Sequence, residues 1–168
     1  MTENEPAIDL PEEDKCAFCD YLAGRRPYTV LWREDRVAVL VTREQRGIAH
    51  LLILPTRHVP SLLHLADEDA ESVMIAVRDA ALTIDRAYER PGIAVWQNNG
   101  LAAHQAIAHL HFHVAGTLPG GGTDFGEVPE LNVEATDKIA ERLAPFVPER
   151  SSAHRRVDAA FAGPTASA

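Results

Sequence analysis

The sequence predicts an α+β fold: an antiparallel β-sheet with one long helix packed on it and a second helix near the C-terminus. Three observations support this prediction. Short β-branched runs follow one another closely between residues 30 and 54, which indicates neighbouring antiparallel strands. A helical stripe of apolar residues occupies positions 73–88. Histidines alternate with apolar residues over positions 109–115, as expected for a strand.

The chain has 168 residues, of which 46% are hydrophobic, enough for one domain with one sizeable core. Residues 1–15 are rich in Glu, Asp and Pro, and we expect them to form a disordered acidic tail. We expect the folded domain to span residues 16–146 and a C-terminal tail to span residues 147–168.

Two absences and the net charge bear on location and partners. The acidic N-terminus lacks the basic and then apolar order of a secretory signal, and no run reaches the roughly 18 apolar residues of a membrane span. These features indicate a cytoplasmic protein with no membrane partner. Phosphate backbones are bound by clustered Lys and Arg, so the formal net charge of -9 argues against broad nucleic-acid binding. A local basic pocket is compatible with that charge.

The first half of the domain alternates short elements with turn residues. Residues Phe18 to Ala23 fit a short helix, which Gly24 and Pro27 end. Three strands with short connections then form an expected antiparallel meander at Val30 to Arg33, Val37 to Thr42 and Ile48 to Leu54.

The second half contains the long helix. We expect Asp67 to cap it, with further acidic residues in the first turn, where the helix dipole favours them. Pro91 and Gly92 end it. The stripe that faces the sheet comprises Val73, Val77, Ala81, Ile84 and Tyr88. The later elements are a strand at Ile93 to Trp96, a loop to Ala108, a strand at His109 to Ala115, a loop at Gly120 to Gly122 and a helix at Ala135 to Phe146.

The alternating run from His109 to Ala115 is the most distinctive feature of the sequence. In an extended strand, His109, His111 and His113 would project from one face and the apolar residues from the other. Three imidazoles on one pleat can form a site for metal, phosphate or proton transfer. The alternative is a polar strand face that happens to be rich in histidine, which the strict alternation disfavours.

His111, at the centre of the run, is a candidate nucleophile. A neutral imidazole can attack phosphorus near neutral pH when its other nitrogen is held by an acceptor. His113 and His50 could stabilise the oxygens of the transition state, provided that the strand of His50 lies beside the His-rich strand. Asn98 and Gln105, on the preceding loop, add neutral donors.

Cys16 and Cys19 are the only cysteines and are spaced C-x-x-C. In a reducing compartment such a pair is a metal half-site or a redox pair rather than a structural disulfide. The polar arm around it is not the βαβ context of a thioredoxin-like motif. His58 and His109 lie near the ends of elements that can face this arm, so they could complete a Cys2His2 zinc site. The alternative is two small buried residues around Phe18.

Together these motifs resemble the histidine triad family, whose signature is His-φ-His-φ-His-φ-φ with φ apolar. Residues 109–115 match the signature without a gap. Residues 16–24 are similar to the N-terminal arm of bacterial members, and residues 50–58 resemble the family segment H-x-L-V-I-P-K-x-H. The Asn and Gln named above stand where the family places them, and the resemblance covers roughly residues 16–145.

The resemblance implies an α+β homodimer that hydrolyses or transfers at the α-phosphate of a nucleotide, with an adenine-containing substrate as the expected partner. It implies that His111 is the nucleophile and forms a nucleotidyl-histidine. It gives phosphate-contact roles to His50, His113, Asn98 and Gln105. In zinc-bearing branches the metal is structural, and the matching ligands are Cys16, Cys19, His58 and His109.

Three positions depart from the family pattern. His104 replaces the small residue that usually precedes the Gln. Ala106 replaces the Ser that usually follows it, so one hydroxyl contact is missing. Thr42 stands where many relatives carry Asp or Asn for the ribose hydroxyls, and we expect it at the substrate site in that place. The resemblance therefore defines the phosphate chemistry better than it defines the nucleoside.

Two classes of function fit these features. The leading interpretation is a hydrolase or nucleotidyltransferase acting on a dinucleoside polyphosphate, a nucleoside phosphoramidate or a related adenylate. The alternative is a nucleotide-binding or zinc-stabilised interaction protein with little turnover, which the missing hydroxyl at Ala106 favours. A DNA-end-processing enzyme of the same family is disfavoured by the net charge and by the lack of a basic extension.

Overall fold

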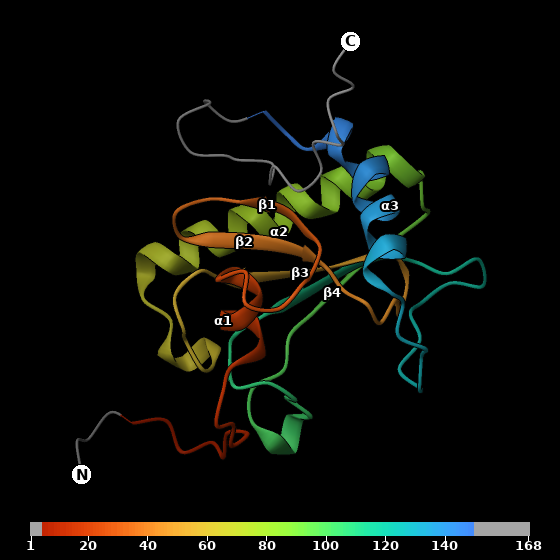
Figure 1. The fold of residues 1–168 in the computed structure, drawn as a ribbon. Coiled ribbons are helices and arrows are strands. Elements are labelled where there is room, and N and C mark those ends of the chain that lie inside the picture. The colour runs from red at the N-terminus through yellow and green to blue at the C-terminus, as the bar shows by residue number, and fades with distance from the viewer. Residues whose placement is uncertain (1–4, 150–168) are drawn as a thin grey trace.

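The computed structural model describes residues 5–149 and contains a five-stranded antiparallel sheet with helices on it (Figure 1), which confirms the α+β prediction. The strand order is β1-β2-β3-β5-β4. The strands are β1 (Val30–Arg33), β2 (Val37–Val41), β3 (Ile48–Pro55), β4 (Ile93–Trp96) and β5 (Phe112–Gly116). The helices are α1 (Ala17–Leu22), α2 (Asp67–Tyr88) and α3 (Val133–Leu143), with 3-10 turns η1 (Leu62–His64), η2 (Leu101–Ala103) and η3 (Ala144–Phe146).

The predicted tails are described only in part. Residues 1–4 and 150–168 lie outside the described residues, so the C-terminal tail stays a prediction. Residues 5–15 contain no helix or strand, and the Leu101 N–H donates to the Asp9 carbonyl oxygen at 2.8 Å. This segment therefore contacts η2.

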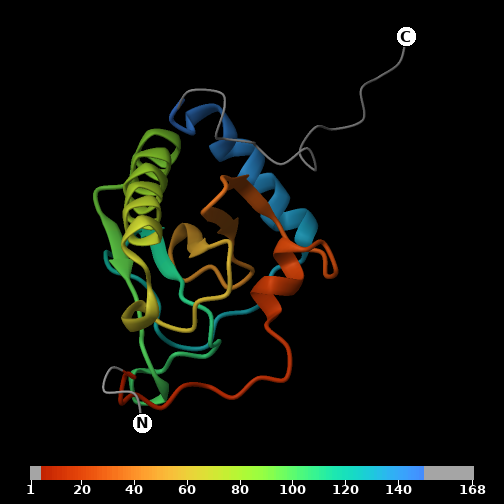
Figure 2. The ribbon, with the colours of Figure 1, turned by 90° about the vertical axis from the view of Figure 1, so that its left-hand side faces the viewer.

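Both faces of the sheet are covered, which explains why β2 is buried at every position and β3 at every position after Ile48. Helices α2 and α3 pack on the face that carries Val39, Leu51 and Val114. Helix α1 packs on the opposite face through Phe18, against Leu40 and its neighbours. Figure 2 shows α2 and α1 on opposite sides of the strands.

The pairing of β3 with β5 brings two predicted site histidines together. Leu52 pairs with His113 on one side of β5, and Trp96 pairs with His113 on the other. The ladder is interrupted just before Leu51, where Ala49 adopts a left-handed backbone with φ of 55°. Such a bulge redirects the next side chain, and here His50 faces His113 across the two strands.

The His-rich strand begins later than the sequence predicts, because β5 starts only at Phe112. Continued pairing would set Leu110 opposite Pro55, which has no N–H for the ladder. The Leu110 N–H instead donates to the Val59 carbonyl oxygen at 2.6 Å. His109 and His111 therefore both lie outside the strand, and the expectation that all three histidines share one strand face is wrong.

Helix α2 is shifted by one residue from the predicted start. Ala66 occupies the capping position without a side-chain bond, and Asp67 is the first helical residue, so the predicted cap is wrong. The helix ends at Tyr88, and Glu89 adopts a left-handed backbone before the predicted stop at Pro91. No helix within residues 5–149 is long and apolar enough to cross a membrane.

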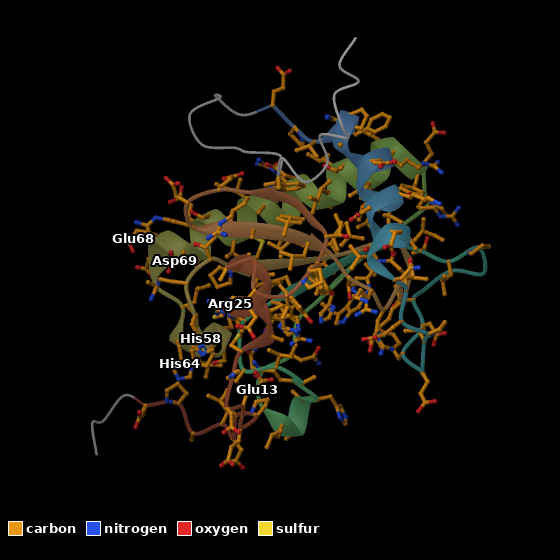
Figure 3. All side chains as sticks on the ribbon, viewed as in Figure 1. Glu13, Arg25, His58, His64, Glu68 and Asp69 are labelled. Carbon is orange, nitrogen blue, oxygen red and sulfur yellow. The ribbon has the colours of Figure 1, made fainter. Side chains whose placement is uncertain are left out.

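One acid of α2 anchors the loop after β3. Asp69, buried in the first turn of α2, accepts from Arg36 at 3.0 Å and from the Arg57 Nε at 2.6 Å. Arg57 immediately precedes His58, so this ion pair fixes the chain at one of the predicted metal ligands. Figure 3 shows Asp69 and His58 on the same side of the molecule.

Candidate functional site

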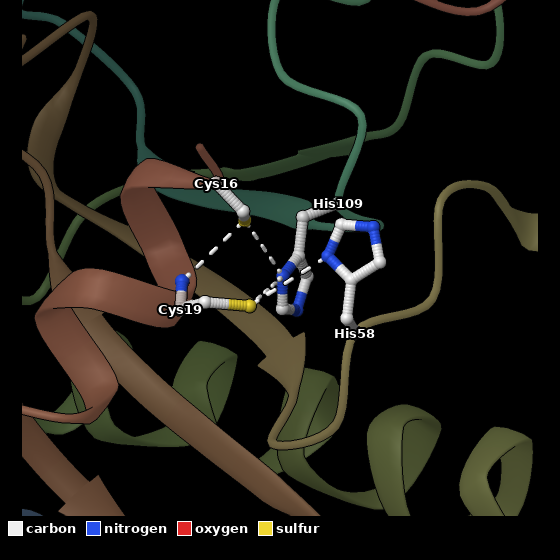
Figure 4. A group of neighbouring side chains, drawn as sticks. All are labelled: Cys16, Cys19, His58 and His109. Atoms are coloured by element: carbon white, nitrogen blue, oxygen red, sulfur yellow. Dashed lines mark hydrogen bonds between the residues drawn. The ribbon is translucent and has the colours of Figure 1, made fainter. Parts of the chain in front are cut away.

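Cys16, Cys19, His58 and His109 converge from α1, from the loop after β3 and from the segment before β5 (Figure 4). Their ligand atoms all lie within 4.8 Å of one another. The Cys16 Sγ lies 3.3 Å from the His109 Nδ1, and the Cys19 Sγ lies 3.6 Å from the Nδ1 atoms of both histidines. Tetrahedral zinc bonds of about 2.3 Å to sulfur and about 2.0 Å to nitrogen give S···N edges of roughly 3.6 Å. The donor set therefore fits a zinc ion.

Hydrogen bonds orient the donors of this metal cluster, as we call these four residues. The His109 Nε2 bonds to the Pro55 carbonyl oxygen at 2.9 Å, so Nε2 carries the proton and the Nδ1 lone pair is directed at the cysteines. The Cys19 N–H donates to the Cys16 Sγ at 3.4 Å. Burial, together with the neighbouring Cys16, raises the pKa of the Cys19 thiol to about 11. A cation in the cluster would favour the thiolate forms.

One ring nitrogen of His111 is hydrogen-bonded, and the other is available to a ligand. Its Nδ1 lies 2.7 Å from the His109 carbonyl oxygen, an acceptor, so Nδ1 carries the proton. No group among residues 5–149 bonds to its Nε2, which keeps a lone pair. The ring packs edge-on against Phe18 at 5.0 Å and against His113 at 4.9 Å.

His50 and His113 form a hydrogen-bonded relay beside His111. The His50 Nε2 lies 3.0 Å from the His113 Nδ1, and the His50 Nδ1 lies 2.9 Å from the Glu44 carbonyl oxygen. The Arg46 N–H also approaches the His50 Nδ1, at 3.3 Å, but that contact requires the opposite tautomer. The shorter contact decides: His50 donates to Glu44, His113 donates to His50, and the Nε2 of His113 is left as an acceptor.

The three histidines of this open cluster, His50, His111 and His113, are neutral near pH 7. Burial lowers the pKa of His50 to about 4 and the pKa of His113, which also faces the other two rings, to about 2. Burial lowers the pKa of His111 as well, although its bond to the His109 carbonyl opposes the shift. Neutral rings can act as nucleophiles or take up a proton when an anion arrives.

Two cavities meet at the open cluster. The smaller cavity, of about 220 Å³, includes Phe18, Tyr28, Thr42 and Ile107 in its lining. The larger cavity, of about 610 Å³, is lined by Trp96, Asn98, Gln105 and Phe125, among others. The residues that line both are Glu44, Arg46, Ala106, His111 and His113. A phosphorus atom at His111 could therefore carry one group into each cavity.

The structure separates the three predicted substrate contacts. Thr42 lines the smaller cavity, whereas Asn98 and Gln105 line the larger one. The Asn98 Nδ2 donates to the Ala103 carbonyl oxygen at 2.7 Å. Both donors of Gln105 are used by main-chain carbonyl oxygens, those of Pro60 at 2.7 Å and Ile107 at 2.9 Å. In this conformation Gln105 holds the loop in place and has no N–H left for a ligand, which differs from the expected phosphate contact.

The lining residues that were not singled out from the sequence include Trp96, Arg46 and Phe125. Trp96 stacks on His113 with ring centroids 4.8 Å apart. Arg46 and Phe125 belong to two loops that are distant in the chain and meet at the cavity mouth. Only Trp96 had a sequence signal, its place at the end of a strand just before Asn98.

The chain is similar to known proteins in both sequence and fold. The family model described as HIT domain matches residues 23–119. The chain is 29% identical over 140 residues to Protein hit of Bacillus subtilis, covering 78% of this chain and 96% of that protein. It is 27% identical over 143 residues to an adenosine 5'-monophosphoramidase of Candida albicans, covering 77% and 91%. Its fold is similar to a crystal structure of a zinc-bound histidine triad family protein from Mycobacterium smegmatis, with a TM-score of 0.66, 21% identity, and 78% and 94% of the two chains covered.

Proposed function

The chain belongs to the HIT domain family, and we propose on that basis that it is a nucleotide hydrolase or nucleotidyltransferase that forms a nucleotidyl-His111 intermediate. The observation that supports this most is the state of His111: its Nδ1 is bonded to a carbonyl oxygen, and its Nε2 is open where two cavities meet. An imidazole held in this tautomer is a competent nucleophile at neutral pH.

In the first step the Nε2 lone pair of His111 attacks the α-phosphorus, and the bond from phosphorus to the leaving group breaks. The leaving group departs with the electron pair of that bond and takes a proton. The Nδ1–H bond to the His109 carbonyl stabilises the positive charge that develops on the ring. In the proposed role of His113, its Nε2 takes up a proton as the phosphate anion enters and then donates to a phosphate oxygen, with His50 behind it.

In the second step a water oxygen attacks the same phosphorus and the bond to Nε2 breaks. The products are a nucleoside monophosphate, a proton and neutral His111. Another hydroxyl acceptor in place of water would make the reaction a transfer. Asn98 and Gln105 hold the loop that lines the larger cavity, and Thr42 lines the smaller cavity, where we propose that the nucleoside binds.

The proposed substrate is an adenylate, such as an adenosine phosphoramidate. A Candida albicans relative is named as an adenosine 5'-monophosphoramidase, which supports this class. The smaller cavity, with the rings of Phe18 and Tyr28 in its lining, suits a flat base.

We propose structural zinc for the metal cluster. Cys16, Cys19, His58 and His109 would hold it, and the ion would supply a cross-link that ties α1 to the loop after β3 and to the segment before β5. With four protein donors the ion has no open position for substrate.

A twofold homodimer and a reducing, cytoplasmic location are part of the same proposal. Strand β4 lies at the edge of the sheet with Val95 48% exposed, and α2 leaves Met74 54% exposed. Exposed apolar residues on an edge strand and a helix suit burial against a second copy. Both cysteines are free, as a reducing compartment would keep them. Light scattering at micromolar concentration tests the dimer.

The proposed activity is tested by incubating the purified protein with adenosine phosphoramidate, adenosine 5'-phosphosulfate and diadenosine tetraphosphate. We expect release of adenosine monophosphate from at least one. Binding of adenosine monophosphate with no turnover of the panel would contradict the enzyme and support the nucleotide-binding alternative.

A further inference from the structure

The larger cavity has an aromatic wall, formed by Trp96 and Phe125. The Trp96 ring lies parallel to His113, with an interplanar angle of 1°. The Phe125 ring meets Trp96 edge-on, with centroids 6.0 Å apart. Phe125 is 77% exposed, more than any other large hydrophobic side chain among residues 5–149. Exposed aromatic rings at the mouth of a cavity are characteristic of ligand contact.

Hydrogen bonds hold Phe125 in this position. The Arg46 guanidinium donates to the Gly126 carbonyl oxygen at 2.6 Å and to the Asp124 carbonyl oxygen at 3.3 Å, on either side of Phe125. The Asp124 N–H donates to the Arg46 carbonyl oxygen at 2.7 Å. The exposed ring is therefore carried by an anchored turn, which lowers the entropy lost when it binds a ligand.

The charges at this cavity disfavour a polyphosphate. Arg46 is the one Arg or Lys in the described lining, and its guanidinium is already committed to the Phe125 turn and to Glu44, at 3.0 Å. The Glu44 carboxylate lies at the same cavity and repels further phosphate groups. A di- or triphosphate leaving group is bound best by uncommitted guanidinium or ammonium groups, and the described lining offers none.

Reaction geometry assigns the two cavities to the two ends of the substrate. In-line attack places the leaving group opposite the nucleophile, while the 5'-oxygen of the nucleoside is equatorial, at right angles to that axis, so the nucleoside and the leaving group point in different directions. His111 and His113 line both cavities, so a nucleoside in the smaller cavity would direct the leaving group into the larger one. Trp96 and Phe125 would then contact the leaving group directly.

We propose that Trp96 and Phe125 form a leaving-group subsite that selects a neutral or cationic organic group with an aromatic body over a nucleoside polyphosphate. This inference rests on the proposed function. For an aromatic amine, the bond from phosphorus to nitrogen breaks as the bond from His111 to phosphorus forms. The nitrogen keeps the electron pair, takes a proton that reaches it from solvent through His113, and leaves as the free amine.

Two substrates that differ only in the ring test the subsite: the adenosine 5'-phosphoramidates of 2-phenylethylamine and of ethylamine. We expect the parent to show a kcat/KM at least about tenfold higher for the phenylethyl compound, the size of one aromatic contact. Diadenosine tetraphosphate should be a poorer substrate than either. In F125A the ratio of the two kcat/KM values should fall at least about fivefold.

F146A is the matched control, since Phe146 is 38% exposed and lines neither cavity. It should keep the parental ratio. A parental ratio near one, an unchanged ratio in F125A, or faster cleavage of diadenosine tetraphosphate would overturn the subsite while leaving the nucleotidyl-histidine chemistry in place.

Calorimetry on H111N separates the subsite from turnover. We expect H111N to bind the phenylethyl compound several-fold more tightly than the ethyl compound, and H111N/F125A to bind the two equally. If the parent hydrolyses neither these two compounds nor any member of the panel given under the proposed function, the proposed function fails. If H111N also binds both compounds equally, the subsite fails on its own measurement.

Discussion

His109 of the metal cluster and His111 of the open cluster are two residues apart in the chain, yet a different ring nitrogen is available in each. His109 donates its Nε2 proton to the Pro55 carbonyl and directs Nδ1 at two cysteines. His111, two residues later, donates its Nδ1 proton to the His109 carbonyl and leaves Nε2 open to two cavities. Both residues are histidines, so the difference lies in which ring nitrogen is hydrogen-bonded to a carbonyl oxygen. That choice leaves His109 able to bind a metal and His111 able to act as a nucleophile.

The surroundings of the two clusters differ in the same way. In the metal cluster the four ligand atoms face one another, and His109 is fully buried. In the open cluster His111 and His113 face a cavity of about 610 Å³. Changes in the metal cluster should therefore reduce stability more than chemistry, and changes in the open cluster should do the reverse.

The largest effect is expected from H111N, which removes the nucleophile from the open cluster. We expect turnover of an adenylated substrate to fall at least about a thousandfold, because the proposed nucleophile is lost. Affinity for adenosine monophosphate should stay within a few-fold of the parent, since the other lining residues remain. Steady-state kinetics and calorimetry measure the two quantities.

H64N is the control for H111N. His64 bonds to Ser61 and lines neither cavity, so its replacement should leave turnover near the parental value. Turnover of H111N within about tenfold of the parent, a barrier change of about 1.4 kcal/mol, would exclude His111 as the obligatory nucleophile.

The next effect is expected from C16S, which removes one donor from the metal cluster. We expect the free energy of unfolding to fall by on the order of 3 kcal/mol and Tm by roughly 6–12 °C, because a cross-link between three parts of the chain is lost. Activity per folded molecule should change less than tenfold. Differential scanning calorimetry and the zinc content of the purified protein measure the effect. A Tm and zinc content equal to those of the parent would contradict a structural metal.

The smallest effect concerns the pH dependence of stability in the open cluster. Burial holds the pKa of His50 at about 4, below its ordinary 6.5, so between these values the unfolded chain takes up a proton that the folded protein does not. Stability is therefore full above pH 6.5 and falls as the pH drops toward 4. In H50Q the loss between pH 6.5 and 5 should be smaller by roughly 1–2 kcal/mol, measured by urea unfolding with zinc present. Equal losses in H50Q and the parent would show that His50 does not titrate in this way.

Much of the fold could be predicted because its signals are local. The strand at Val37 and the stripe on α2 follow from periodicity alone. The start of β5 could not, since it depends on Pro55 in another strand, which cannot pair with Leu110. His109 and His111 lie outside the strand for that reason, and only His113 lies within it.

The site could be predicted as a set of residues but not as a network. The residue types at His111 and Cys16 indicate their chemistry, because imidazole and thiol have few other uses at such spacing. The aromatic wall at Phe125 could not be found, since an exposed Phe between glycine-rich stretches has no periodicity. Hydrogen bonds with Arg46, which is far away in the chain, hold it at the cavity.

The most direct test of the central claim is to look for the covalent intermediate on His111. The protein is mixed with an equimolar adenylated substrate, quenched in alkali within milliseconds to seconds, and examined by intact-mass spectrometry and peptide mapping. We predict a transient mass increase of one adenylyl group on the peptide that contains His111, labile to acid and absent from H111N. Full turnover with no such adduct at any time, or an adduct on another residue, would contradict the account.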